Sequence, residues 1–201
     1  MIYLKPNFIT PEERLQIRQQ VLDLRPHWRS IQHTWYGLGD SAYTVQDISK
    51  INQEVKSLLI EEFSWLHDRI CAEITRQKNI PTELHPTLPC PGFHISEVPI
   101  DYTPPTYHID SNVQGFIPNV DIETVYSVLL LIERPTPGAW LDYLKDDKSR
   151  IFHYEYNAFH QWKGTLKHRV GGYKVLPGEY RITLQCHYYH DKEAGKNYLY
   201  F

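Results

Sequence analysis

Three short stretches in the second half of this 201-residue chain carry side chains that can bind a metal ion and an anion: His108-Ile109-Asp110, His168 and Arg181-Ile182-Thr183. Two imidazoles and one carboxylate can hold a divalent transition-metal ion from one side and leave its other positions open. A guanidinium with a hydroxyl beside it can bind a carboxylate through several hydrogen bonds. These residue types therefore predict a metal centre with a site for an organic acid next to it.

The His-x-Asp tripeptide is weak evidence by itself, because a chain with 11 histidines contains roughly one such tripeptide by chance. In a strand, however, residues i and i+2 point to the same face, so His108 and Asp110 would present their side chains to one point. His168 lies on a separate predicted strand and would supply the second imidazole. We therefore expect His108, Asp110 and His168 to be the metal ligands and the catalytic centre.

Arg181 lies in Tyr180-Arg181-Ile182-Thr183-Leu184, where alternation places Arg181 and Thr183 on one face of a strand. A buried guanidinium that faces a metal site is costly unless an anion occupies the space beside it. Both residues are thus candidates for anion binding. A second interpretation stays open, in which Arg181 is a surface residue paired with an Asp or Glu.

Other histidines compete with His168 for the role of ligand. His187 and His190 are separated by three residues, which places them on opposite faces of a strand, and we interpret them as ordinary residues of a late strand or loop. His153 and His160 lie on predicted strands and could be buried beside the site or exposed. Only His168 has an Arg-x-Thr sequence downstream, so His168 stays the preferred ligand.

The N-terminal part of the chain has helical patterns. Thr10-Pro11 followed by two acidic residues is typical of a helix start and predicts a helix over 11–24, and apolar residues at three- and four-residue steps predict a long amphipathic helix over 49–77. Residues 27–47 lack sustained periodicity and predict an irregular segment. Such a segment could be a lid over a site or an ordinary surface loop.

Short β-branched and aromatic runs separated by turn residues dominate the rest of the chain. They predict about eight strands, at 93–98, 106–111, 123–132, 139–144, 151–156, 158–162, 167–170 and 180–189. This spacing predicts two facing sheets, as in jelly rolls and cupins, and helices followed by strands give an α+β fold. We expect one domain over 1–201, in which 1–92 are mainly supporting helices and loops and 93–190 form the strand core.

The order His-x-Asp, His, Arg-x-Thr, with roughly 10 to 15 residues between the second His and the Arg, resembles the Fe(II)/2-oxoglutarate-dependent dioxygenases of the prolyl-hydroxylase-like group. The resemblance covers roughly residues 93–189. It implies a double-stranded β-helix core, Fe(II) held by His108, Asp110 and His168, 2-oxoglutarate held by Arg181 with Thr183, and O2 as the oxidant. Halogenating members of the family give the carboxylate position to a halide, so Asp110 implies hydroxylation or a related oxidation such as desaturation.

Two segments match the family pattern less well. Gly138-Ala139-Trp140-Leu141 resembles its Gly-Gly-x-Leu segment but departs from it at Ala139 and Trp140. Tyr156-Asn157-Ala158-Phe159 stands where members often have a Pro-Gly turn. Further side chains could point inward, and of these we expect Tyr126 to contact 2-oxoglutarate, with a packing role as the alternative; the candidates are His94, Ser96, Tyr126, Ser127 and Trp140.

Composition sets limits on partners. The formal net charge of −3 and pI near 6.4 give no strong signal for nucleic acid, although the sequence around His168 is locally basic. Three cysteines without CxxC spacing argue against a disulfide framework or a structural zinc site. No stretch approaches the ~20 apolar residues of a membrane span, and the N-terminus lacks a signal-peptide pattern. We expect a cytoplasmic protein.

Three functions remain in competition. The first is an Fe(II)/2-oxoglutarate oxygenase acting on a small molecule or an amino-acid side chain. The second is a cupin-like metalloprotein, either an isomerase or a ligand-binding module, that does not use 2-oxoglutarate. The third is a non-catalytic β-sandwich whose histidines are structural.

Overall fold

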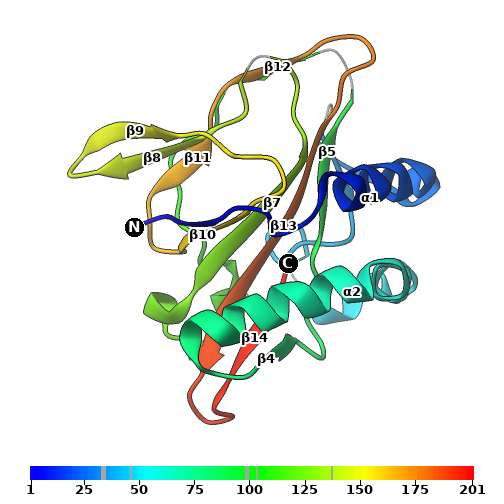
Figure 1. Cartoon of the computed structure of the whole chain (residues 1–201). Helices are drawn as coiled ribbons and strands as arrows, with labels where there is room; N and C mark the ends of the chain where they lie inside the picture. Colours follow the sequence, from blue (N-terminus) through cyan, green and yellow to red (C-terminus); the bar gives the residue numbers. More distant parts are fainter. Residues whose placement is uncertain (33–34, 46, 98–99, 103, 137) are drawn as a thin grey trace.

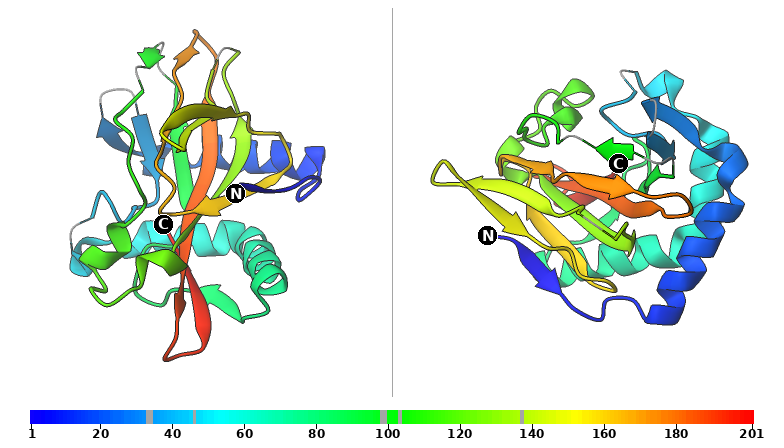
Figure 2. Two further views of the ribbon diagram at one scale, coloured as in Figure 1. Left: turned by 90° about the vertical axis from the view of Figure 1, so that its left-hand side faces the viewer. Right: turned by 90° about the horizontal axis from the view of Figure 1, so that it is seen from above.

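The computed structural model describes residues 1–32, 35–45, 47–97, 100–102, 104–136 and 138–201, with the backbone alone at 32 and 100–102. Its central feature is a large twisted sheet. Helices α1 (Pro11–Asp23) and α2 (Gln53–Lys78) cover one face of this sheet, and a smaller sheet lies on the other side (Figures 1 and 2). The α+β sandwich expected from the sequence is confirmed at this level.

Within the described residues the large sheet has nine strands, with the order β1-β10-β7-β13-β5-β3-β2 and with β14 pairing with β13 and β4. The smaller sheet has the order β11-β8-β9, and β12 pairs with β6. The strands are β1 (Tyr3–Lys5), β2 (Arg29–Gln32), β3 (Trp35–Leu38), β4 (Thr82–Leu84), β5 (Gly92–Ser96), β6 (Ile100–Tyr102), β7 (Tyr126–Glu133), β8 (Leu141–Lys145), β9 (Lys148–Phe152), β10 (Phe159–Lys163), β11 (His168–Val170), β12 (Tyr173–Val175), β13 (Arg181–Asp191) and β14 (Lys196–Tyr200). Short 3-10 helices lie at Arg25–His27, Ile48–Lys50, Asn112–Gly115 and Ile122–Thr124.

The two central strands, β7 and β13, sort their side chains onto opposite faces. Their even-numbered residues pack against the helices in the main core: Val128, Leu130, Ile132, Ile182, Leu184 and Cys186. Their odd-numbered residues face the smaller sheet and the space between the two sheets, and include Ser127, Leu129, Leu131, Arg181, Gln185 and His187. Because side chains alternate along a strand, polar groups can gather on one face while the other stays apolar.

Both predicted helices form, with ends set by their caps. Thr10 Oγ1 accepts a hydrogen bond from the Glu13 N–H at 3.1 Å, and the Glu13 carboxylate accepts one from the Thr10 N–H at 2.8 Å, which is a capping box. The second helix begins later than the predicted residue 49, because Asn52 caps it by accepting hydrogen bonds from two backbone N–H groups. It ends at Lys78 and is followed by the cap residue Asn79, whose backbone adopts the left-handed conformation with φ 55°.

The strand predicted over 106–111 is wrong. Among the described residues its β pairing is limited to an isolated bridge between His108 and His168, and Pro104 and Pro105 directly before it cannot donate backbone hydrogen bonds. The prediction over 123–132 began too early, because the 3-10 helix Ile122–Thr124 is capped by Asp121. The prediction over 151–156 ran too long, since β9 ends at Phe152.

Residues 27–47 are more regular than the sequence predicted. Strands β2 and β3 form an antiparallel pair, and β3 pairs with β5, so this segment extends the large sheet. Each strand has four residues, which is too short for an alternating pattern to be visible in the sequence. Residues 33, 34 and 46 of this segment lie outside the described residues.

The three cysteines, Cys71, Cys90 and Cys186, are buried free thiols in the core on the helix side. Burial raises the pKa of the Cys90 thiol to about 12. They are therefore placed away from the polar face of β13. Among the described helices, none is long and apolar enough to cross a membrane.

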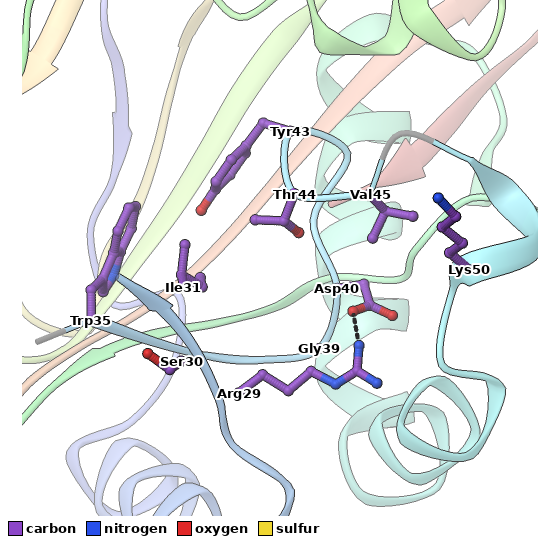
Figure 3. A pocket seen from close by; sticks show the side chains of 10 residues that line it. All are labelled: Arg29, Ser30, Ile31, Trp35, Gly39, Asp40, Tyr43, Thr44, Val45 and Lys50. Atoms are coloured by element: carbon purple, nitrogen blue, oxygen red, sulfur yellow. Dashed lines mark hydrogen bonds and ion pairs between the residues drawn. The ribbon is translucent and has the colours of Figure 1, made fainter. Parts of the chain in front are cut away.

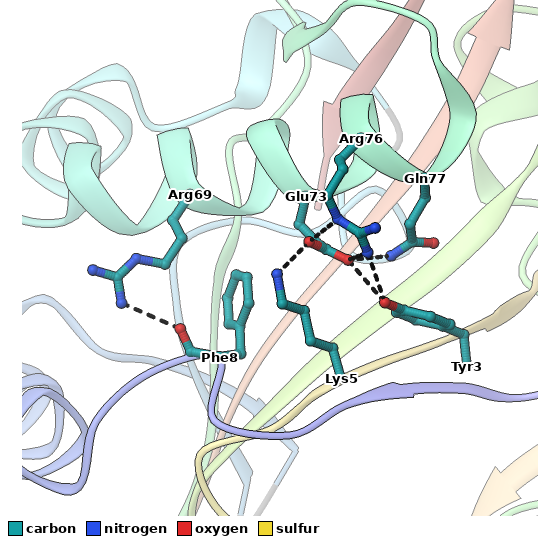
Figure 4. Close-up of polar contacts among 7 residues, drawn as sticks. All are labelled: Tyr3, Lys5, Phe8, Arg69, Glu73, Arg76 and Gln77. Carbon is teal, nitrogen blue, oxygen red and sulfur yellow. Dashed lines mark hydrogen bonds and ion pairs between the residues drawn. The ribbon is translucent and has the colours of Figure 1, made fainter.

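A buried carboxylate joins the N-terminal segment to α2 (Figure 4). Glu73 on α2 accepts hydrogen bonds from Tyr3 Oη at 2.9 Å, Lys5 Nζ at 2.6 Å and both Arg76 and Gln77 (Figure 4). Burial opposes ionisation of Glu73, but these donors outweigh it and lower its pKa to about 2. The bonds from Tyr3 and Lys5 to Glu73 therefore hold β1, at the edge of the large sheet, against the helix.

We predict that Glu73→Ala lowers the free energy of unfolding by about 2 to 4 kcal/mol, because its donors lose a buried charged acceptor. Since the folded pKa lies below the ordinary value, this contribution is complete above about pH 4.5 and decreases as the pH falls towards 2. Urea unfolding at pH 7 and pH 3 measures it. Glu61→Ala, an exposed glutamate on the same helix, is the control and should change stability by less than about 0.5 kcal/mol. Equal effects of the two substitutions would contradict the prediction.

Candidate active site

The three predicted metal ligands lie together between the sheets. His168 Nε2 is 3.4 Å from Asp110 Oδ2, and His108 Nε2 is 3.9 Å from Asp110 Oδ1. One ligand atom of each residue lies within 4.8 Å of those of the other two. Asp110 and His168 are buried, whereas about half of the His108 side chain is exposed. The cluster therefore has a buried side and an open side, and an ion held here could also bind molecules from solution.

Backbone hydrogen bonds place the ligands where no continuous strand does. His108 and His168 exchange two of them, at 3.0 and 2.9 Å, and the Asp110 N–H donates to the Gly164 carbonyl at 2.8 Å. A Cβ at Gly164 would lie 2.8 Å from Val125 and 3.0 Å from the Asp110 carbonyl oxygen, so only glycine allows this close approach. Backbone hydrogen bonds to His168 and Gly164 thus hold the His-x-Asp segment in place.

A side-chain cluster anchors the residues next to both histidines. Asp142 on β8 accepts hydrogen bonds from Tyr107 Oη at 2.8 Å and from Arg169 Nε at 2.9 Å. The Arg169 guanidinium also lies over the Tyr107 ring, 4.2 Å from its centroid. Because Tyr107 precedes His108 and Arg169 follows His168, this cluster holds the two ligands in a fixed relation.

The local electrostatics suit a cation. Burial raises the pKa of Asp110, but His187, His168 and the Ser127 hydroxyl outweigh that effect, and its pKa lies below the ordinary value. Burial lowers the pKa of His168, opposed by Asp110. At neutral pH Asp110 is therefore a carboxylate and His168 a neutral imidazole, which are the protonation states that bind metal ions.

A cavity of about 580 Å³ connects this cluster to Arg181. Arg181 is 5% exposed, and within the described residues no hydrogen bond or ion pair involves its guanidinium. Its Nε is buried without a partner, and its guanidinium lies 5.2 Å from the Tyr173 ring centroid. The interpretation of Arg181 as a surface residue is wrong: it is a buried cation that faces an open space.

Two hydroxyls flank Arg181 differently. Thr183 Oγ1 is buried and unbonded within the described part of the chain, but Thr183 does not itself line the cavity. Tyr154 lines the cavity, and Arg181 and Asp110 both influence its pKa, which burial raises. Tyr154 thus lines the same cavity as Arg181 and the cluster of His108, Asp110 and His168. No sequence pattern singles out Tyr154, because it follows β9 in a stretch without regular structure.

The structure does not bring Tyr126 into the cavity. Its ring stacks on Tyr188 at 5.1 Å, and Lys78 of α2 lies 3.6 Å from its centroid, so it faces the helices. This corrects the prediction that Tyr126 contacts 2-oxoglutarate: the neighbouring Ser127 points inward instead, one residue along the same strand. Trp140 lies against Gly171 and His153 and is also absent from the cavity wall described here.

His187 is the functional candidate that the sequence reasoning dismissed. It is buried, lines the cavity, and its Nδ1 lies 3.2 Å from Ser127 Oγ and 3.8 Å from Asp110 Oδ2. His187 and His190 do lie on opposite faces of the strand, as expected, but it is His187 that faces the cavity. The available signal was parity with Arg181, since both are odd-numbered residues of one strand.

Trp35, Tyr43 and His94 also line the cavity. His94 bonds to the Tyr43 hydroxyl, and burial together with Arg181 lowers the pKa of His94 to about 3. Trp35 and Tyr43 also line a second hollow of about 620 Å³, where Arg29 pairs with Asp40 at 2.8 Å (Figure 3). Part of the segment 27–47 thus forms a wall between the two cavities.

No protein-family model matches the sequence, and the comparison with curated protein sequences gives no match. Solved structures do match. The epimerase SnoN from nogalamycin biosynthesis, which is non-heme and alpha-ketoglutarate-dependent, has a TM-score of 0.60 at 12% identity, covering 94% of this chain and 79% of that one. HygX from Streptomyces hygroscopicus, with nickel and 2-oxoglutarate bound, has a TM-score of 0.59 at 11% identity, covering 95% and 83%.

A prolyl-4-hydroxylase from Pseudomonas putida has a TM-score of 0.54 at 12% identity, covering 95% of this chain and 92% of that one. At such low identities the similarity shows the fold. The similarity supports the α+β sandwich over nearly the whole chain. This protein has the fold of the 2-oxoglutarate- and Fe(II)-dependent oxygenases.

Proposed function

We propose that this protein is an Fe(II)- and 2-oxoglutarate-dependent oxygenase that hydroxylates a C–H bond of a small molecule or an amino-acid side chain. One observation carries the proposal: a single cavity holds both the cluster of His108, Asp110 and His168 and the guanidinium of Arg181, which lacks an anionic partner among the described residues. An uncompensated buried cation beside a metal-ligand cluster fits an anion that bridges the two.

The ligand set fits Fe(II). Two neutral imidazoles and a carboxylate on one side of an ion form the arrangement that non-heme Fe(II) oxygenases use. His108 and His168 each direct Nδ1 towards a backbone carbonyl, at 3.3 and 2.8 Å, which orients Nε2 towards Asp110. Such bonds fix the tautomer that binds a metal ion.

The other end of the cavity fits 2-oxoglutarate. The far carboxylate of this acid would pair with Arg181 and accept a hydrogen bond from Tyr154 or Thr183, and its chain would lie against apolar side chains of the cavity wall such as Leu129, Leu141 and Val170. Arg181 Nε and Thr183 Oγ1 are buried polar atoms without partners in the described part of the chain. Both would then gain the acceptor that burial requires.

When bound, Fe(II) with 2-oxoglutarate and O2 would supply the oxidation that inserts oxygen into a C–H bond, with succinate and CO2 as co-products. The residues of this chain contribute position and surroundings. Trp162 and Leu129 exclude water from the inner wall, and Tyr154 orients the acid. The open side near His108, Ile109 and Asn112 receives the prime substrate. A volume of about 580 Å³ is in the range of small-molecule sites.

We further propose that the facing sheets form a double-stranded β-helix. In the described residues β5, β13, β7 and β10 are adjacent in the large sheet, and β8, β9 and β11 face them. The metal cluster lies between the two sheets, at the bridge between His108 and His168. Asp110 occupies the position that would otherwise be open to a halide, which supports hydroxylation.

We predict that His168→Ala weakens Co(II) binding, used as a stand-in for Fe(II), by roughly 100-fold or more, since loss of a ligand should exceed the 10- to 100-fold effect of a supporting residue. Titration of the metal-free protein, followed by the visible absorption of Co(II), measures this. His153→Ala removes an exposed histidine and should leave binding unchanged. Unaltered Co(II) binding by His168→Ala would refute the metal assignment.

We predict that Arg181→Ala raises the apparent Kd for 2-oxoglutarate by about 30-fold or more, while Co(II) binding changes by less than about 3-fold. The visible absorption band of the anaerobic complex with Fe(II) and 2-oxoglutarate reports binding, and succinate release reports turnover. Arg150→Ala, an exposed arginine on β9, serves as the control. A wild-type protein that binds metal but gives neither the band nor succinate would favour the cupin-like alternative.

A further inference from the structure

Behind Asp110 lies a chain of hydrogen bonds that the metal cluster itself does not explain. The Ser127 hydroxyl donates to Asp110 Oδ2, and His187 Nδ1 lies 3.2 Å from Ser127 Oγ. Ser127 and His187 are directly opposite each other on β7 and β13, so the pairing of two central strands fixes their distance. Both are buried, with 0% and 4% exposure. The chain therefore runs from one strand of the large sheet to another and ends on the carboxylate.

Counting hydrogens gives the direction of each bond. An ionised Asp110 has no hydrogen, so the single hydroxyl hydrogen of Ser127 points to it. Ser127 Oγ must then act as acceptor towards His187, and His187 must carry its hydrogen on Nδ1. The direct distance from His187 Nδ1 to Asp110 Oδ2, 3.8 Å, is too long for a hydrogen bond. Ser127 thus relays the interaction.

The two oxygens of Asp110 consequently differ. Oδ2 accepts a hydrogen bond from Ser127 and lies 3.4 Å from His168 Nε2, whereas Oδ1 has no donor among the described residues and lies 3.9 Å from His108 Nε2. A carboxylate with one oxygen fixed by a hydrogen bond cannot rotate freely, so it offers the other oxygen in a constant direction. This arrangement favours binding of an ion through Oδ1, because the Ser127 hydroxyl already uses one lone pair of Oδ2.

We propose that Ser127 and His187 are positioning residues that orient Asp110 for monodentate metal binding, and that His187 does so as its Nδ1–H tautomer. The inference rests on the proposed metal site and goes beyond it by giving a role to two residues outside the ligand set. It also leaves His187 Nε2 as an acceptor, without a partner in the described residues, on the cavity wall.

Two substitutions of His187 separate this role from simple packing. Asn places its amide nitrogen near the position of Nδ1, whereas Gln places its amide near Nε2. Asn can therefore keep the donor to Ser127 and Gln cannot. We expect His187→Gln and Ser127→Ala to weaken Co(II) binding by about 10- to 100-fold and to change the visible Co(II) spectrum, and His187→Asn to stay within about 3-fold of the wild type.

Ser96→Ala is the matched control, because Ser96 is equally buried, on β5 of the same sheet, and bonds to Tyr173 rather than to a metal ligand. Circular dichroism checks that each variant folds, and if Ser127→Ala does not, the two His187 variants decide. Nitrogen NMR of the Zn(II)-loaded wild type should show His187 protonated at Nδ1.

The outcomes distinguish the metal site from the positioning role of Ser127 and His187. A wild-type protein that binds no Co(II) overturns the metal site itself. Tight Co(II) binding with an unchanged spectrum in both Ser127→Ala and His187→Gln, or His187 protonated at Nε2, leaves the metal site standing and overturns the positioning role. Equal losses in His187→Asn and His187→Gln would also contradict it, because packing alone would then account for the effect.

Discussion

The buried charge of Asp110 is the constraint on which this arrangement depends. A carboxylate enclosed between two sheets loses its hydration, which destabilises the fold unless neighbouring groups compensate. Compensation comes from separate strands: Ser127 on β7, His168 on β11 and His187 on β13. One side chain thus requires both layers of the sandwich to meet in a fixed register. A bound cation would complete the compensation that these neutral groups begin.

The two faces of the large sheet have different surroundings: an apolar core on one side and a polar cavity on the other. On its helix side the alternating residues are apolar and fully buried, and α1 and α2 pack on them. On its other side the same strands present Arg181, Gln185 and His187 to the cavity. Among the described residues that line the cavity, none comes from either helix. The helices therefore support the cavity indirectly, by holding the sheet in place. The hydrogen bonds of Glu73 to Tyr3 and Lys5 of β1 contribute to this support.

The convergence of His108, Asp110 and His168 could be predicted because their chemistry is carried by residue type, and the helices could be predicted because their periodicity and caps are local. The strand over 106–111 was wrong even though His108 and Asp110 do converge, since contacts with His168 and Gly164 replace strand geometry. The prediction for Tyr126 was wrong because Tyr126 faces the helices, whereas its neighbour Ser127 faces the cavity. No local sequence pattern fixes which of the two points inward. Tyr154 and His187 depend on contacts between distant segments, and such contacts appear only in the folded chain.

The imidazoles deep in the cavity share a property that follows from their enclosure. Burial lowers the pKa of His94 to about 3 and also lowers the pKa values of His168 and His187, so these rings carry no charge at pH 7. Arg181, on the same cavity wall, carries a guanidinium that these neutral rings do not repel. The enclosed histidines therefore add polarity to the cavity wall at neutral pH without adding positive charge to that of Arg181.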